Sequence, residues 1–273
     1  MSTNTVDKPR KVTTTTLRQM KAAGEKIAMM TAYDFGMATL VDASGMDVIL
    51  VGDSATNVMA GNATTLPMTL DEMIYHARCV ARATHRALVV ADMPFGTYQV
   101  SAEDGVRSAI RLMKESGVEA VKIEGGAAVA PTIRRIVDAG IPVMGHLGLT
   151  PQSVNQLGGY GVRGKSDSEA ARLIADARLL EEAGCFAMVL EKVPASLAAE
   201  VSAAVGIATI GIGAGSGTDG QVLVLNDMLG LNEGFRPKFL RLYAELAPVI
   251  DQALKHYIDD VKTAAFPSAA ESY

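Results

Sequence analysis

Eight short apolar runs recur along the chain, and segments of helical periodicity separate most of them. The runs cover residues 26–33, 47–52, 87–92, 120–125, 142–148, 187–192, 208–215 and 221–227. Nearly continuous apolar strands are typical of a parallel sheet that is covered on both faces. Thr69 with Glu72, and Ser166 with Glu169, have capping-box spacing and predict two helix starts between the runs.

Alternation of strand and helix eight times predicts a (β/α)8 TIM barrel. A doubly wound open sheet is the alternative fold with the same alternation. No linker rich in Pro, Gly or Ser divides the sequence. We therefore expect a single barrel domain over residues 1–273, with a short N-terminal arm over about 1–12 and a flexible C-terminal tail over about 266–273.

Two predicted strand-to-helix connections are much longer than the others. They cover residues 54–68 and 148–165, and each follows the carboxyl end of a strand. Long loops in a compact domain usually have a function, such as a lid or a binding loop. Barrel enzymes carry their active sites at this end of the strands, so we expect the site here.

Polar residues end most of the apolar runs, although strand interiors avoid carboxylates. These residues are Asp34, Asp53, Asp92, Glu124, His146 and Glu191. If the sheet closes, they meet on one rim. Several carboxylates around one cavity do not all stay ionised without a cation or raised pKa values. Mg2+ binds carboxylates together with substrate oxygens and water, so the pattern predicts Mg2+ or a similar divalent cation.

Simpler interpretations exist for each of these residues. An acid at a strand end often caps the following helix or turn. Lys122 and Glu124 are two residues apart and face the same side of their strand, which fits either an anion-and-metal site or an internal salt bridge. His146 could be a buried core histidine. Glu191 lies among apolar residues, a setting typical of a general base.

Gly215, Gly217 and Gly220 have the spacing of a dinucleotide-binding loop. No well-placed strand-end acid follows about 20 residues later, as that motif requires. We therefore do not expect NAD. In a barrel, the same glycines would let backbone N–H groups approach an anionic ligand.

Composition narrows the choice of partners and compartment. The 273 residues are 49% apolar and carry a formal net charge of -5, without a cluster of Lys and Arg. Nucleic-acid binding and anionic-membrane binding lack their electrostatic signature. The two cysteines have no metal or redox spacing, nothing near the N-terminus resembles the apolar region of a signal peptide, and no apolar run reaches transmembrane length. We expect a cytoplasmic protein.

Long motifs across the chain resemble the ketopantoate hydroxymethyltransferase family. They include MMTAYDFGMA, VGDSATNVMAGNATTLPMTLDEMIYH, ADMPFGTY, VKIEGG, GHLGLTPQSVNQLGGYGVRG, LEKVP and GIGAGSGTDGQVLVLNDMLGL, within about residues 13–265. The resemblance implies a pyruvate/phosphoenolpyruvate-type barrel. It also implies transfer of a hydroxymethyl group from methylene-tetrahydrofolate to 3-methyl-2-oxobutanoate, giving ketopantoate for pantothenate and coenzyme A synthesis.

The resemblance also assigns roles to the rim residues. Asp53, Asp92 and Glu124 would bind the metal, Glu191 would be the proton acceptor, and the substrate would contact Asp53, Ser54, Asp92, Lys122 and His146. Lys192 stands where the family commonly has Cys or a small residue. The family forms large homo-oligomers, so we expect a homodecamer of two stacked pentamers.

Two rival functions remain open at this point. A Schiff-base aldolase would use Lys122 as its nucleophile, since a lysine inside a barrel is activated by desolvation. A non-catalytic scaffold that binds a metal or ligand is the other, because a fold alone does not establish activity.

Overall fold

The computed structural model describes residues 10–232, 234 and 236–273. By its contacts the chain divides into two compact units, residues 1–223 and 224–273, and each is described by itself. Residues 1–9 of the expected N-terminal arm lie outside the described residues. The expectation of one domain with an arm and a flexible tail stays a prediction.

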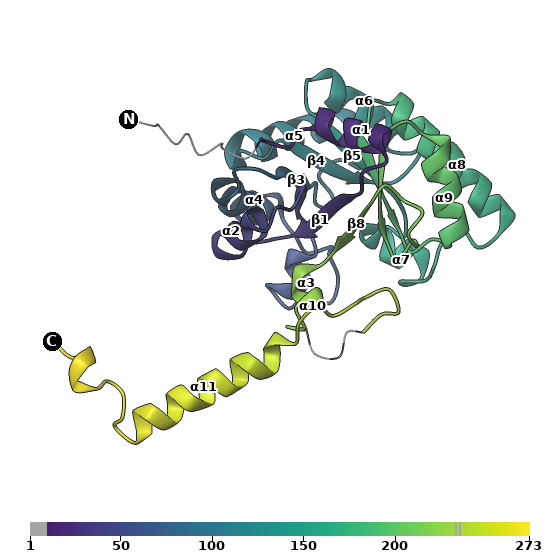
Figure 1. The fold of residues 1–273 in the computed structure, drawn as a ribbon. Helices are drawn as coiled ribbons and strands as arrows, with labels where there is room; N and C mark the ends of the chain where they lie inside the picture. The colour runs from purple at the N-terminus through teal and green to yellow at the C-terminus, as the bar shows by residue number, and fades with distance from the viewer. Residues whose placement is uncertain (1–9, 233, 235) are drawn as a thin grey trace, which may run out of the picture. The chain divides into compact units, whose positions relative to one another are not determined.

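The first unit contains a closed parallel barrel whose strands follow one another in chain order (Figure 1). The strands are β1 (Ile27–Thr31), β2 (Val48–Val51), β3 (Leu88–Asp92), β4 (Ala120–Glu124), β5 (Val143–Gly148), β6 (Ala187–Glu191), β7 (Ala208–Ile212) and β8 (Gly220–Leu223). Closure comes from parallel pairing of β8 with β1. The predicted TIM barrel is confirmed, and the open sheet is excluded.

Helices pack around the outside of this barrel in the view of Figure 1. They are α2 (Phe35–Ala43), α4 (Leu70–Ala83), α5 (Ala102–Ser116), α6 (Ala130–Asp138), α8 (Asp167–Glu182) and α9 (Ala195–Ala204). The short helices α3 (Ala55–Val58) and α7 (Val154–Leu157), with a 3-10 turn, η1 (Pro151–Ser153), lie in the long connections after β2 and β5. The capping box of Thr69 and Glu72 forms as predicted. Ser166 also caps α8, but the Glu169 carboxylate accepts from the N–H groups of Gly164 and Lys165 instead.

The connection between β7 and β8 departs from the predicted alternation. Residues 213–219, all of them described, join the two strands without a helix. A Cβ on Gly215 would lie 2.4 Å from the Ala195 Cβ, and one on Gly217 would lie 2.7 Å from the Ala199 Cβ. Both alanines belong to α9. These glycines therefore allow close packing of the connection on α9, which is a different use from the anion contact suggested by their spacing.

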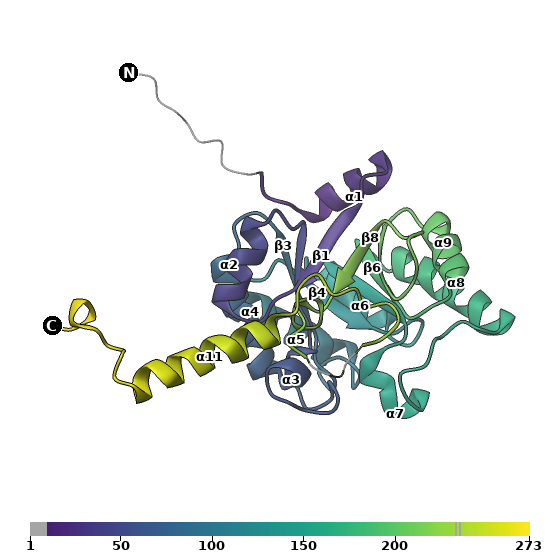
Figure 2. The ribbon, with the colours of Figure 1, turned by 60° about the horizontal axis from the view of Figure 1, so that its bottom comes forward.

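Alternate residues of each strand fill the barrel interior with apolar side chains. This buried cluster includes Ile27, Met29, Val48, Leu50, Leu88, Val90, Ala120, Met144, Ala187, Val189, Ala208, Ile210 and Val222. Leu17 and Met20 belong to the same cluster and come from α1 (Thr14–Ala23). Figure 2 shows α1 beside the start of β1. The Lys21 ammonium lies 2.8 Å from Asp219 Oδ2, just before β8, and fixes α1 at this end of the barrel.

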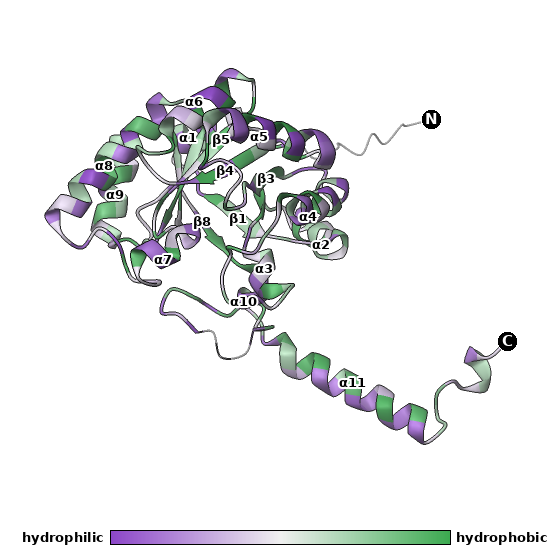
Figure 3. Ribbon diagram, turned by 180° about the vertical axis from the view of Figure 1, so that it is seen from behind, coloured by the Kyte–Doolittle hydropathy of each residue, from purple (hydrophilic) through white to green (hydrophobic). Residues whose placement is uncertain are grey.

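The second unit contains α10 (Leu225–Met228), α11 (Leu246–Lys262) and a 3-10 turn, η2 (Ala269–Glu271). Apolar and polar residues alternate along α11 (Figure 3). Within the described part of the chain, no helix has the length and apolar character that a membrane crossing requires.

Truncation of the Leu17 side chain tests the role of α1 in closing the core. Leu17 has no exposed surface, so Leu17→Ala leaves a cavity and should lower the free energy of unfolding by about 2–5 kcal/mol. Urea denaturation measures this. The neighbouring exposed Arg18→Ala should change stability by less than about 0.5 kcal/mol. Equal stability of the two variants would contradict the proposed packing.

Asp42 gives the fold a defined pH dependence. Its carboxylate accepts from the consecutive N–H groups of His85, Arg86 and Ala87 at 2.7–3.1 Å. Burial alone would raise the pKa of Asp42, but these N–H donors and, more weakly, Lys11 lower it below its usual value. The ionised carboxylate therefore stabilises the fold above the unfolded-chain pKa of about 3.9, and this contribution is lost as the pH falls through the folded-state pKa.

Asp42→Asn tests this contribution, because the new amide group presents donors to backbone donors. The variant should be about 1–3 kcal/mol less stable at pH 7. The deficit should shrink as the pH falls below about 4, toward the lowered folded-state pKa at which the wild-type carboxylate protonates. Chemical denaturation between pH 3 and 7 measures both effects, with the exposed Asp138→Asn as the matched control. A deficit that is constant with pH would argue against the ionised carboxylate as its source.

Candidate active site

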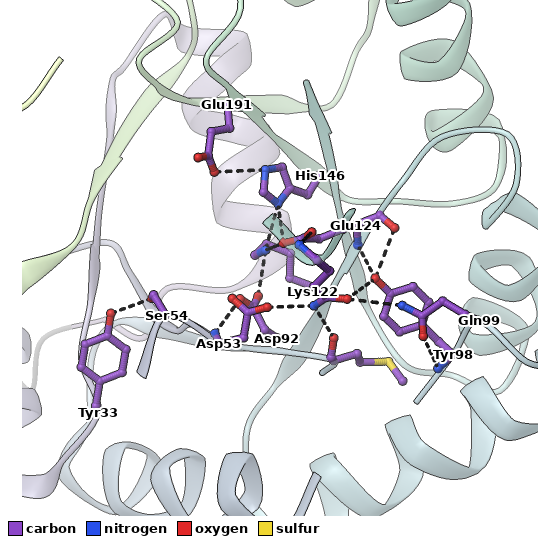
Figure 4. A network of polar contacts seen from close by, with 12 residues as sticks. Tyr33, Asp53, Ser54, Asp92, Tyr98, Gln99, Lys122, Glu124, His146 and Glu191 are labelled. Carbon is purple, nitrogen blue, oxygen red and sulfur yellow. Dashed lines mark hydrogen bonds and ion pairs between the residues drawn. The ribbon is translucent and has the colours of Figure 1, made fainter. Parts of the chain in front are cut away.

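Every second residue of a strand faces the inside of the barrel. At the carboxyl ends of the strands these inward-facing residues are polar (Figure 4). On β3, Leu88 and Val90 are followed by Asp92; on β4, Ala120 is followed by Lys122 and Glu124. Strand pairing puts Asp92 opposite Lys122 and Glu124 opposite His146. Residues from four strands, including Glu191 at the end of β6, therefore form one polar layer above the apolar core.

Lys122 occupies the centre of this layer. Its Nζ lies 2.9 Å from Asp92 Oδ1, 3.8 Å from Glu124 Oε1 and 3.1 Å from His146 Nδ1. Burial lowers the pKa of Lys122, but Asp92, Glu124 and Asp53 outweigh burial and raise the pKa above its usual value. The side chain is therefore an ammonium group at neutral pH.

Asp53 and Ser54 follow β2; Asp53 lies beside Asp92, whereas the Ser54 side chain points toward Tyr33 (Figure 4). The Asp53 N–H donates to Asp92 Oδ2 at 2.9 Å, and the hydroxyls of Ser54 and Tyr33 are hydrogen-bonded at 2.8 Å. A Cβ at Gly52 would lie 2.7 Å from Ser54 Oγ, so glycine permits this turn. Burial and the charges of Asp92 and Glu124 raise the pKa of Asp53 well above its usual value, despite Lys122 and Gln152.

His146 links Glu124 to Glu191. Its Nδ1 lies 3.3 Å from Glu124 Oε1, and its Nε2 lies 3.4 Å from Glu191 Oε2. Burial and Lys122 lower the pKa of His146, but Glu124 and Glu191 more than offset both and raise it to about 9. The contact with Lys122 favours a neutral ring that accepts at Nδ1, whereas two carboxylates favour the protonated ring. Because two carboxylates oppose one ammonium, we assign a positive charge to His146.

Gln152 and Tyr98 complete the site and were not singled out in the sequence. Gln152 Nε2 donates to Asp53 Oδ2 at 2.9 Å, and its main-chain N–H donates to Glu124 Oε2 at 3.0 Å. The Tyr98 hydroxyl donates to Gln152 Oε1 at 2.7 Å. Both residues are uncharged and lie in loops, so neither alternation nor charge indicated them. The length of the loop over 148–165 was the one signal that pointed to Gln152.

The loop after β5 is held beside the site by Lys192. This residue adopts a left-handed conformation with φ 46°. Its Nζ donates to the Tyr160 carbonyl, and its own carbonyl accepts from the Arg163 N–H at 2.9 Å. Burial, followed by the charges of Asp53 and Glu191, raises the pKa of the Tyr160 hydroxyl, which therefore stays protonated beside the acidic cluster.

Asp34 does not join the rim cluster, although it follows β1. Its carboxylate accepts from the Met37 N–H at 2.9 Å and caps α2. For this residue the simpler capping interpretation is the correct one.

The donor set suits a hard divalent cation. Asp53, Asp92 and Glu124 contribute buried carboxylate oxygens, the type of ligand that such cations prefer. Burial, followed by the charges of Asp92 and Glu124, raises the pKa of Asp53, and a cation among these carboxylates would favour its ionised form. Within the described residues, no group of three or more His, Cys, Asp or Glu is already arranged around a metal position. In this structure, the Lys122 ammonium neutralises Asp92.

The chain is similar over its full length to several known proteins. It is 61% identical to the 3-methyl-2-oxobutanoate hydroxymethyltransferase of Porphyromonas gingivalis over 273 residues, which is 100% of both chains. It is 60% identical to that of Parabacteroides distasonis over 273 residues and 57% identical to that of Chlorobium phaeobacteroides over 277 residues, again over 100% of both chains.

Solved structures share the barrel at much lower identity. Phosphonopyruvate hydrolase, in a complex with oxalate and Mg++, has a TM-score of 0.61 at 12% identity, covering 95% of this chain and 93% of that one. A 2,3-dimethylmalate lyase of the PEP mutase/isocitrate lyase superfamily has a TM-score of 0.57 at 17% identity, covering 95% and 90%. These likenesses concern the fold alone.

The close relatives are hydroxymethyltransferases, so this chain is a transferase. The alternative function, a non-catalytic scaffold that binds a metal or ligand, is therefore excluded. The sequence profile of one family, ketopantoate hydroxymethyltransferase, matches residues 11–269. The chain therefore belongs to the ketopantoate hydroxymethyltransferase family.

Proposed function

We propose that this protein transfers a hydroxymethyl group from methylene-tetrahydrofolate to 3-methyl-2-oxobutanoate, giving ketopantoate for pantothenate and coenzyme A synthesis. The observation that carries the proposal is the rim cluster of buried Asp53, Asp92, Lys122, Glu124 and His146 with the partly exposed Glu191. The names of the relatives support the 2-oxo acid as the acceptor. The folate donor rests on the family resemblance.

Glu191 is the proposed proton acceptor. The reaction must first remove the C3 proton of the 2-oxo acid, a weak carbon acid. Glu191 is the most exposed acid of the cluster, with 17% of its side-chain surface accessible, whereas the side chains of Asp92 and Glu124 are 3% accessible. It therefore reaches a substrate placed above the cluster while His146 orients its carboxylate at 3.4 Å.

Positive charge at the rim stabilises the enolate that forms when the proton leaves. Lys122 and His146 present an ammonium and an imidazolium where negative charge grows on the 2-oxo acid. Asp53, Asp92 and Glu124 would hold Mg2+, and Ser54 would contact the substrate carboxylate. When bound, this ion would supply Lewis-acid polarisation of the 2-oxo group. The loop over residues 54–68 would close over the site and keep water from it during the addition, together with the loop over 148–165 that Lys192 holds through the Tyr160 carbonyl.

The Schiff-base alternative is less well supported. A lysine nucleophile needs an unprotonated amine, which enzymes obtain by desolvation or by a second nearby cation. Three carboxylates around Lys122 raise its pKa and favour the ammonium form. Lys122 is therefore better suited to neutralise charge than to attack a carbonyl carbon.

Assembly and location stay predictions. The family resemblance leads us to propose a homodecamer of two stacked pentamers in the cytoplasm. Size-exclusion chromatography with light scattering would test the decamer.

Replacement of Glu191 by Gln keeps the shape of the side chain and removes the base. Glu191→Gln should slow solvent exchange of the C3 proton of 3-methyl-2-oxobutanoate by about 100-fold to 10,000-fold. Proton NMR in D2O measures the exchange without the folate donor, and isothermal titration checks that the substrate still binds. The exposed Glu200→Gln is the control and should exchange at the wild-type rate. Exchange at the wild-type rate in Glu191→Gln would remove Glu191 as the base.

Removal of divalent ions distinguishes metal-assisted enolisation from Schiff-base formation on Lys122. Treatment with a chelator should abolish C3 exchange, and Mg2+ alone should restore it. In parallel, borohydride added with the 2-oxo acid should leave Lys122 unmodified in the peptide mass spectrum. Exchange that survives the chelator, together with substrate trapped on Lys122, would favour the Schiff-base aldolase.

A further inference from the structure

Gln152 contacts two of the three carboxylates that are proposed to hold the cation. It belongs to η1 in the loop after β5, and 5% of its surface is exposed. The side-chain amide donates to Asp53 Oδ2, and the main-chain N–H of the same residue donates to Glu124 Oε2. Asp53 follows β2 and Glu124 ends β4, so one residue fixes two acids from separate strands.

The amide orientation of Gln152 is determined by its neighbours. Nε2 faces two acceptors, Asp53 Oδ2 and the Met93 carbonyl, each at 2.9 Å. Oε1 faces a donor, the Tyr98 hydroxyl, at 2.7 Å. Both N–H groups of the amide are therefore used, and its oxygen has a partner. A flipped amide would place oxygen against two oxygens, so a single orientation satisfies the site.

Tyr98 anchors this amide from the opposite side. Its side chain is 2% exposed, and its hydroxyl also lies 3.3 Å from the main-chain N and O of Glu124. The chain of contacts runs from Tyr98 through Gln152 to Asp53, with Glu124 held at two points. Such a chain orients the carboxylate oxygens before any ligand arrives.

We propose that Gln152 is a positioning residue that orients the carboxylates of Asp53 and Glu124 toward a shared divalent cation. Partners that orient metal ligands typically contribute a factor of about 10–100 to metal affinity. This inference rests on the proposed metal-assisted function, and it adds a residue to the support of that site. Gln152 contacts ligand residues, so its effect reaches the cation through them.

Gln152→Met tests the side-chain contacts alone. Methionine has a similar length and no donor, and the main-chain contact with Glu124 is kept. The full-length protein is titrated with Mn2+ alone, and free Mn2+ is measured by electron paramagnetic resonance. Gln152→Met should weaken Mn2+ binding by about 10–100-fold. The matched control is Gln156→Met on α7, where the side chain is exposed, and its Kd should stay within about two-fold of wild type.

A second variant covers a failure of Gln152→Met to fold. Tyr98→Phe removes the hydroxyl that holds the amide and should weaken Mn2+ binding in the same direction by a smaller factor. Thermal unfolding without metal is recorded for every variant. A lower unfolding temperature with an unchanged Kd, in either variant, would mean that the residue only stabilises the fold and would overturn the inference.

The wild-type titration separates this inference from the proposed function. If the wild-type protein binds Mn2+ and Gln152→Met binds it within two-fold, the role of Gln152 is wrong and the metal site stands. If the wild-type protein binds no Mn2+, the proposed metal-assisted function fails, and the inference fails with it.

Discussion

The charge balance in one buried layer is the constraint on which the rest of this structure depends. Four carboxylates, those of Asp53, Asp92, Glu124 and Glu191, share the rim with Lys122 and His146. Buried charges are tolerated when they are paired and hydrogen-bonded. The pairing here is incomplete, because four carboxylates face two basic side chains, and burial together with the charges of Asp92 and Glu124 raises the pKa of Asp53. That deficit of positive charge is what makes the layer suited to a divalent cation and an anionic substrate.

The barrel carries the apolar residues that stabilise the fold and the polar residues of the proposed reaction at different positions along its strands. Below the rim, the inward positions are apolar, and Leu17 and Met20 of α1 belong to that buried core. At the rim, the same alternation brings Asp92, Lys122, Glu124, His146 and Glu191 to neighbouring inward positions at the carboxyl ends of the strands. Because these residues stand on paired strands, their spacing is set by the sheet and not by flexible loops. The loop residue Gln152 then fixes the orientation of Asp53.

Much of this arrangement could be predicted from the sequence, and the limits have physical causes. The alternation of strands with helices and the acids at strand ends are visible in short stretches of sequence. They therefore predict the barrel and the proximity of Asp53, Asp92 and Glu124. Asp34 shows where that reasoning fails, since a strand-end acid that caps a helix looks the same in sequence. The glycines at 215 and 217 resembled a ligand loop because contact with α9 depends on tertiary packing. Gln152 and Tyr98 were missed because neutral loop residues reveal their partners only in three dimensions.

Anomalous diffraction tests the central claim most directly. Crystals grown with Mn2+ and 3-methyl-2-oxobutanoate should show one anomalous peak at the rim. The account predicts that oxygens of Asp53 and Asp92 lie next to the ion, with Glu124 bound to it directly or through one water, and that the 2-oxo acid shares it. A complex with the 2-oxo acid at the rim and no peak among these carboxylates would contradict the account.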